Sequence, residues 1–182
     1  MRDHQVVSRL STWRGRCETI STGGDCRDAS WVDANARLQE EFRYYTAEAW
    51  QPGGNRGGID VDDVQQLVRL NTEGRLRLVD GDNVEIFPGI RAYTGARHTF
   101  ASQYLGVDGN PSFVLASDSV YLYRNLAEHK PSATFSEADY PANIKSQERM
   151  IQLAGSPDRV VPGHDALQFQ RFPTKGRVAK IK

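Results

Sequence analysis

Cysteine is nearly absent from this chain, which has two thiols among 182 residues, Cys17 and Cys26. Two thiols are too few for a disulfide scaffold, and they show no metal-type spacing. We interpret them as incidental thiols of a reduced, cytoplasmic protein. Long apolar runs are missing too, since none approaches the roughly 20 residues that cross a bilayer. The first residues, MRDHQVVSRL, lack the apolar segment of a signal peptide.

Neither sign of charge is in excess, because lysine plus arginine and aspartate plus glutamate each total 23. A protein that binds nucleic acid usually carries a basic excess or patch, and none stands out in this sequence. Charged residues make up 25% of the chain and hydrophobic residues 38%, which is globular rather than disordered composition. We therefore expect one domain with a buried core and no nucleic-acid partner.

The hydrophobic pattern predicts a layered α/β or α+β domain whose sheet is built mostly from hairpins. Residues 1–29 have no sustained period and are predicted to be irregular. Asp60 is a plausible N-cap of a helix that Gly74 ends, and a hairpin is expected around Asp80-Gly81. The segment 120–130 is ambiguous. The expected strands are 36–39, 75–95 as the hairpin, 102–107, 112–117 and 158–162, and the expected helices are 40–50, 59–74 and 143–156.

Three residues of metal-ligand type each follow an apolar strand. His98 comes after the strand through Tyr93, Asp118 ends the strand SFVLAS, and His164 ends RVVPG. Loops at one edge of a sheet are where sites are assembled in layered folds. Imidazole and carboxylate together suit zinc, iron or manganese. The pattern therefore predicts that the three side chains share a metal site.

Each of these residues also has a simpler explanation. Asp118 would serve as a helix N-cap, His164 as a turn residue with Asp165 as the cap, and His98 as a donor to a backbone carbonyl. One shared site explains all three positions together. His4 and His129 have no such context and are interpreted as surface residues.

Three segments in this order, YTGARHTFASQYLGV, FVLASDSVYLYRNL and VVPGHD, resemble the later motifs of the metallo-β-lactamase superfamily. The resemblance is greatest to the quorum-quenching N-acyl-homoserine lactonases. It implies an αββα sandwich, in which two sheets pack together and the metals lie at one edge. Residues 30–182 would then be the C-terminal part of a single domain of this kind, after an irregular or non-native segment, 1–29.

The resemblance also implies roles for individual residues. His98 matches the third histidine ligand of the first metal, Asp118 the carboxylate that bridges two metals, and His164 the last ligand of the second metal. Tyr121 matches the tyrosine that contacts the substrate carbonyl in the lactonases, with a packed aromatic as the alternative. The implied cofactor is zinc, with two ions in the family.

The family motif H-x-H-x-D-H is missing from this chain. The glycine pair that usually follows it matches Gly23-Gly24, but the segment reads RCETISTGG, with no histidine and with Glu18 as its only carboxylate. Four of the seven ligands in the family pattern are therefore absent, and the N-terminal sheet is expected to be largely missing. Two protein ligands for each ion would make a poor site.

Two kinds of function follow from these observations. The first is a metal-dependent hydrolase that opens a lactone or cleaves a related ester, with Asp118 and Tyr121 as catalytic residues in the family mechanism. Such an enzyme would bind a small-molecule lactone or ester substrate. A homodimer is the assembly that we consider, and we expect no membrane partner. The second is a non-catalytic, degenerate domain that binds or regulates. A wrong start codon or reading frame over residues 1–22 would also explain the missing motif. We expect the chain as written to bind metal weakly and to be an impaired hydrolase.

Overall fold

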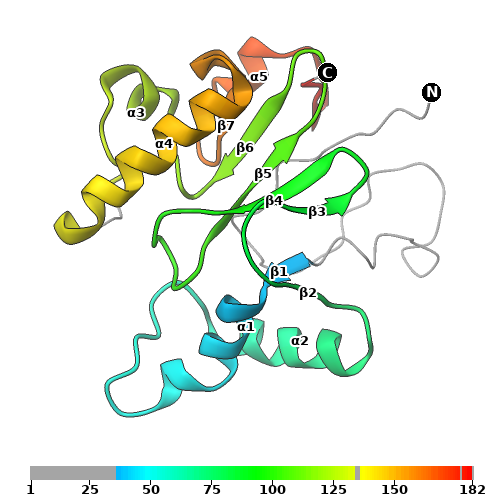
Figure 1. The fold of residues 1–182 in the computed structure, drawn as a ribbon, viewed down its shortest axis with the longest axis vertical. Coiled ribbons are helices and arrows are strands. Elements are labelled where there is room, and N and C mark those ends of the chain that lie inside the picture. The colour runs from blue at the N-terminus through cyan, green and yellow to red at the C-terminus, as the bar shows by residue number, and fades with distance from the viewer. Residues whose placement is uncertain (1–35, 134–135, 177, 182) are drawn as a thin grey trace. The chain divides into compact units, whose positions relative to one another are not determined.

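The computed structural model describes residues 36–133, 136–176 and 178–181, so the predicted irregular segment 1–29 lies outside the described residues. Within these ranges the chain divides after Asp80 into two compact units, residues 36–80 and the residues from Gly81 onward (Figure 1). No helix in these ranges is both long enough and apolar enough to cross a bilayer.

The unit of residues 36–80 contains two short parallel strands and two α-helices. Strand β1 (Ala36–Leu38) pairs with β2 (Arg77–Val79), and between them lie α1 (Gln39–Thr46), the 3-10 helix η2 (Glu48–Trp50) and α2 (Val61–Thr72). The helix predicted at 59–74 is confirmed by α2, with Asp60 at its N-cap position. The prediction of a hairpin around Asp80-Gly81 is wrong. The partner of β2 is β1, some forty residues earlier, which no local turn signal reveals.

The second unit is built on a five-stranded sheet of order β3-β4-β5-β6-β7. The first four strands form an antiparallel meander, and β7 joins β6 in parallel. The tight turn between β3 and β4 contains Gly89, whose φ of 75° lies in the left-handed region that glycine adopts without strain. The strands are β3 (Val84–Phe87), β4 (Ile90–Thr94), β5 (Gln103–Val107), β6 (Phe113–Ser117) and β7 (Val160–Pro162).

Helix α4 (Tyr140–Ala154) is the longest helix of this unit, and it contacts β6 and β7. It begins three residues before the predicted 143–156 helix and ends, as expected, at Gly155, which is left-handed with φ 72°. The ambiguous segment 120–130 contains α3 (Tyr123–Glu128). The remaining elements are η3 (Glu137–Asp139), η4 (Pro157–Arg159), α5 (Gln168–Arg171) and the antiparallel pair β8 (Thr174–Lys175) and β9 (Val178–Ala179).

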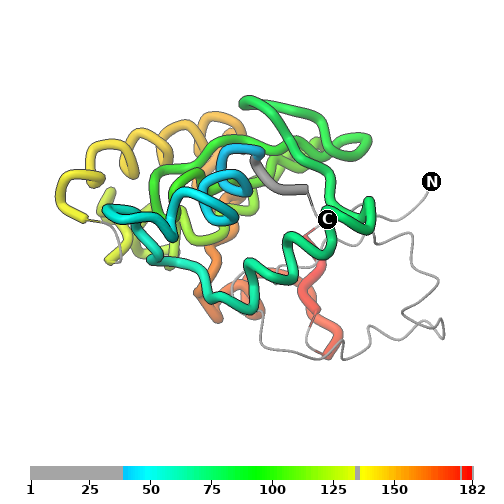
Figure 2. Tube along the Cα trace, turned by 90° about the horizontal axis from the view of Figure 1, so that it is seen from below, coloured from blue at the N-terminus to red at the C-terminus, as the bar shows by residue number. Residues whose placement is uncertain are grey.

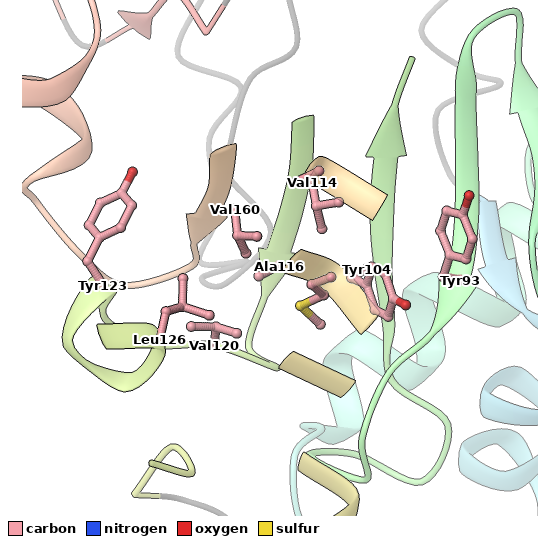
Figure 3. Close-up of a cluster of buried hydrophobic side chains, with 10 residues drawn as sticks. Tyr93, Tyr104, Val114, Ala116, Val120, Tyr123, Leu126 and Val160 are labelled. Atoms are coloured by element: carbon pink, nitrogen blue, oxygen red, sulfur yellow. The ribbon is translucent and has the colours of Figure 1, made fainter. Parts of the chain in front are cut away.

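The core lies between this sheet and the helices on one of its faces. Figure 2 shows α4, in yellow to orange, running beside the green strands. Side chains of four strands meet those of α3 and α4 in one buried cluster (Figure 3). Strand β6 lies between β5 and β7 and is almost wholly buried, which explains its unbroken apolar sequence FVLAS. The members of the cluster are Tyr93, Tyr104, Val114, Ala116, Val120, Tyr123, Leu126, Met150, Ala154 and Val160.

The mixed α/β class predicted from the sequence is confirmed. A smaller apolar cluster, which includes Phe113, Leu115 and Val161, is separate from the one under α4. In the part of the chain that the structure describes, the other sheets are the two-stranded β1-β2 and β8-β9. The second large sheet of an αββα sandwich is not among the described residues.

Candidate functional site

The topology of the sheet brings three strand ends to one edge. Strand β5 is antiparallel to both β4 and β6, so β4 and β6 run in the same direction, and β7 is parallel to β6. Their carboxyl ends therefore share an edge. His98 lies in the loop after β4, Asp118 follows β6 directly, and His164 comes two residues after β7.

The three predicted ligand residues meet at this edge, with Asp118 in the middle. The Nε2 atom of His164 lies 2.9 Å from Oδ1 of Asp118, within hydrogen-bond distance. The Nε2 atom of His98 lies 3.5 Å from the other oxygen, Oδ2. All three side chains keep some contact with solvent, with exposed fractions of 17% for His98, 24% for Asp118 and 36% for His164. One carboxylate thus presents a separate oxygen to each of two imidazoles.

Tyr121 lies against both imidazoles. Its ring centroid is 4.3 Å from that of His164, in a tilted arrangement, and 5.7 Å from that of His98, edge to face. The aromatic residue that the resemblance singled out is therefore part of the same cluster. Its role toward a substrate stays a prediction.

The backbone around Asp118 is shaped to make this meeting possible. Ser117 has a φ of 48°, a left-handed conformation that costs a non-glycine residue free energy and turns the chain sharply at the strand end. Gly163, just before His164, leaves no room for a side chain. A Cβ atom there would lie 2.6 Å from the carbonyl oxygen of Ser117 and 3.3 Å from Oδ1 of Asp118.

Backbone hydrogen bonds join the two segments that carry Asp118 and His164. Gly163 donates its N–H to the carbonyl of Val120 at 2.9 Å, and His164 donates to the carbonyl of Tyr121 at 3.0 Å. These bonds fix the separation of the Asp118 loop from the His164 turn. The imidazole and the carboxylate therefore meet without a sequence motif that spans both.

The simpler explanation of Asp118 does not hold. Helix α3 begins at Tyr123, and its N-cap position is Leu122, four residues after Asp118. The carboxylate points instead toward the two imidazoles. His129 behaves as predicted for a surface residue, because its side chain is 55% exposed and lies 3.3 Å from Glu148. His4 lies outside the described residues.

Sequence reasoning considered Asp165 only as a possible cap and missed its second contact. Its carboxylate accepts the N–H of Leu167, two residues on, at 2.9 Å, which is a turn contact, and also the N–H of Tyr123 at 2.8 Å. The N-cap position of α5 is Leu167, so the prediction of Asp165 as the cap is wrong. Asp165 is only 9% exposed, so these charge-assisted hydrogen bonds are largely shielded from water. Asp165 thus ties the turn after His164 to the start of α3. Its place directly after a ligand-type histidine was the available signal.

The donor chemistry of the cluster suits zinc, but the number of donors does not complete a catalytic site. Two imidazole nitrogens and a carboxylate are ligands that zinc accepts. However, the 2.9 Å contact is a hydrogen bond between two of those donors. Within the described ranges, no group of three or more His, Cys, Asp or Glu side chains is arranged to hold an ion. The cluster is therefore a partial donor set.

Comparison with known proteins gives a likeness to part of one fold. No family model and no curated protein matches the chain. Among solved structures, it is similar to a mutant of AiiA from B. thuringiensis with N-decanoyl-L-homoserine bound at the active site. The two are 22% identical, with a TM-score of 0.46, over 55% of this chain and 40% of that chain.

Two further structures give the same picture. One is a quorum-quenching N-acyl homoserine lactone hydrolase, 22% identical with a TM-score of 0.46 over 55% of this chain and 41% of that chain. The other is an N-acyl homoserine lactone hydrolase with its product N-hexanoyl-L-homoserine bound at the catalytic metal center. It is 22% identical to this chain, with a TM-score of 0.46 over 55% of this chain and 40% of that chain. The chain spans about two fifths of the length of these structures.

Proposed function

We propose that this chain carries the C-terminal half of the active site of a metal-dependent hydrolase, of the metallo-β-lactamase superfamily and most like an N-acyl-homoserine lactonase. The observation that supports this most directly is the meeting of His98, Asp118 and His164 at the carboxyl ends of three strands. These residues lie some twenty to sixty-six positions apart in the sequence. Chance placement of two imidazoles around one carboxylate is a poor explanation of the cluster.

In this proposal His98, Asp118 and His164 are the residues that would hold zinc. A bound zinc ion polarises a carbonyl oxygen and lowers the pKa of its water toward neutrality. Asp118 orients the two imidazoles, since each of its oxygens faces one of them. Tyr121 forms one wall of the cluster and is the candidate to contact the carbonyl of a lactone or ester substrate.

We expect the activity of this chain to be low, because H-x-H-x-D-H is not in its sequence. A catalytic zinc normally keeps three protein ligands and a water, and a two-metal site needs more. The three residues supply at most three ligands to one ion or two to each of two. A non-catalytic domain is therefore the second candidate. It is favoured by the 2.9 Å contact between Nε2 of His164 and Oδ1 of Asp118, which pairs two of the donor atoms with each other.

Zinc titration of the purified chain separates these candidates. The dissociation constant would be measured by competition with a chromogenic chelator, alongside hydrolysis of an N-acyl-homoserine lactone. Loss of a residue that merely supports a ligand typically costs about 10–100-fold in metal affinity. We therefore expect Asp118→Ala and His164→Ala each to weaken zinc binding by at least about tenfold. His129→Ala is the matched control, because it also removes an imidazole, but one that is exposed and pairs with Glu148 instead of Asp118.

Each outcome decides between the readings. Weak zinc binding that both site variants reduce and His129→Ala leaves unchanged supports the proposed site. Equal losses in all three variants would place the zinc elsewhere and remove the proposal. A wild-type chain that binds no zinc under these conditions supports the non-catalytic domain. Tight zinc binding with lactonase activity that Asp118→Ala abolishes would contradict the expected impairment.

A further inference from the structure

A buried polar network links helix α4 to the loop that carries Asp118 and Tyr121. The amide nitrogen Nδ2 of Asn143, in the first turns of α4, donates to the backbone carbonyl of Ser119 at 2.8 Å. The hydroxyl of Ser132 accepts the N–H of Tyr121 at 3.1 Å. These two contacts hold the residue directly after Asp118 and the backbone of the tyrosine that lies against both imidazoles.

The two contacts belong to one connected set. Oδ1 of Asn143 accepts the N–H of Ser132 at 3.3 Å and an amide N–H of Gln147 at 3.0 Å. Gln147 also donates to the carbonyl of Lys130 at 2.9 Å. The segment before α4 and the helix itself are thereby fixed to each other. The loop after β6 is held by both.

The network is costly for a helix face that packs on a core. Asn143, Gln147 and Ser132 are completely buried, and Ser119 is 1% exposed. Among the described residues, Oε1 of Gln147 has no hydrogen-bond partner at all. An apolar residue at these positions would avoid the desolvation of the side chains, but it would leave the Ser119 carbonyl and the N–H groups of Tyr121 and Ser132 without these partners. Fixed placement of the backbone they bind accounts for them.

The opposite side of the same loop is already held by the His164 segment. Val120 and Tyr121 offer their carbonyls to Gly163 and His164, as described above. The loop is therefore clamped between α4 on one side and the end of β7 on the other. If either clamp loosens, the Asp118 carboxylate can move relative to both imidazoles.

We propose that Asn143 and Ser132 are positioning residues, which hold the Asp118–Tyr121 loop so that one carboxylate lies between His98 and His164. The catalytic value of this arrangement rests on the proposed function. The positioning itself does not, because it is carried by hydrogen bonds between groups of the chain.

Ser132→Ala is the variant that tests this with the least disturbance. It removes the acceptor of the Tyr121 N–H and leaves Asn143 in place. Ser119→Ala is the matched control. It also deletes a buried hydroxyl, one residue from Asp118, but that hydroxyl has no hydrogen-bond partner among the described residues, and the carbonyl bound by Asn143 remains. Asn143→Leu removes the larger clamp.

The measurement is NMR of metal-free protein at one fixed pH near neutrality. We expect amide hydrogen exchange at Tyr121 to speed up by about tenfold in Ser132→Ala, the loss of one hydrogen bond. We also expect the imidazole ¹⁵N resonances of His98 and His164 to move toward those of a free, tautomer-averaging ring. Ser119→Ala should leave both signals at their wild-type positions. Asn143→Leu should shift the imidazoles further, and if it does not fold, Ser132→Ala decides alone.

Unchanged imidazole resonances in a folded Ser132→Ala protein would overturn the proposal, because the contact would then act only on its own amide. Equal shifts in Ser119→Ala would overturn it too, as a general effect of hydroxyl loss. The outcome is independent of zinc. If the chain binds no zinc but Ser132→Ala shows the expected imidazole shifts, the positioning proposal stands and the proposed function fails. If the chain binds zinc at the proposed site but the imidazole resonances of Ser132→Ala do not move, the proposed function stands and the positioning proposal fails.

Discussion

Replacement of Tyr104 by phenylalanine should stabilise this protein. Tyr104 is completely buried in the core between the sheet and α4, and its ring stacks on that of Tyr93, with centroids 5.3 Å apart and planes 8° apart. Its hydroxyl has no hydrogen-bond partner among the described residues. Phenylalanine keeps the ring and its packing and removes only the unpaired group.

The size of the effect follows from the cost of that group. A buried polar group without a partner costs about 1–3 kcal/mol relative to its hydrated state. We therefore expect Tyr104→Phe to raise the free energy of unfolding by about 1–2 kcal/mol at neutral pH. Tyr45→Phe is the control, because Tyr45 is equally buried but donates to the carbonyl of Gly57 at 2.6 Å. That substitution should destabilise its unit by about 1 kcal/mol.

Alkaline pH should enlarge the difference. Burial raises the pKa of Tyr104 to about 12, against about 10 in an unfolded chain. Between these values the unfolded chain loses the phenolic proton while the folded chain keeps it, so the stability of the wild type falls as pH rises. The fall amounts to about 1.4 kcal/mol for each pH unit in this window. Phenylalanine has no phenolic proton to lose, so the stability of the variant does not fall in this way.

Urea unfolding at several pH values, followed by circular dichroism and tryptophan fluorescence, measures both effects. The expected result is a more stable variant at neutral pH, whose advantage over the wild type grows above about pH 10. A Tyr104→Phe protein that is less stable than the wild type by 1 kcal/mol or more would mean that the hydroxyl has a partner. An advantage that stays constant to high pH would refute the assignment of the raised pKa.

Two further substitutions test the site and the sheet. Gly163→Ala should cost about 1–3 kcal/mol of unfolding free energy, because its Cβ would lie 2.6 Å from the carbonyl oxygen of Ser117 and backbone on both sides must shift; a melting temperature equal to that of the wild type would refute the close approach. Burial alone would raise the pKa of Asp82, but hydrogen bonds from Arg149 and from the N–H and hydroxyl of Thr94 bring it below its ordinary value. This ionised carboxylate therefore stabilises the fold above the unfolded pKa of about 3.9 and stops doing so as pH falls through its folded pKa. The side chains of Asp82 and Arg149 are about 40% exposed, so Asp82→Asn should lower the free energy of unfolding by only about 0.5–1 kcal/mol near neutrality. Below about pH 4, the free energy of unfolding of the variant should depend less on pH than that of the wild type. An acid dependence equal to that of the wild type would contradict the ion pair.

Several features of the fold could be predicted because their causes are local. The apolar run of β6, the alternation of β5, the apolar period of α2 and the glycine after α4 are each set by neighbours within a few residues. The same holds for the three ligand-type residues, whose position just after a strand is visible in the sequence. From local patterns alone, however, their meeting was only an expectation.

Pairings between distant segments were the part that local patterns missed. Residues around Asp80-Gly81 carry a good hairpin signal, yet β2 pairs with β1 and the real hairpin turns at Gly89. A turn signal shows that the chain can reverse, but burial and strand partners elsewhere decide whether it does. The same limit hid the buried amide of Asn143, which reads in sequence as one polar residue on an amphipathic helix.

By itself, then, the sequence determined where the strand β6 ends, that the helices α2 and α4 form, and that two histidines and an aspartate follow apolar strands. Only the tertiary structure decided that β4, β6 and β7 end at one edge and that Asp118 lies between His98 and His164. The parallel pairing of β6 with β7 joins segments more than forty residues apart. It depends on the packing of α4 across both strands, and no periodicity within either strand encodes it.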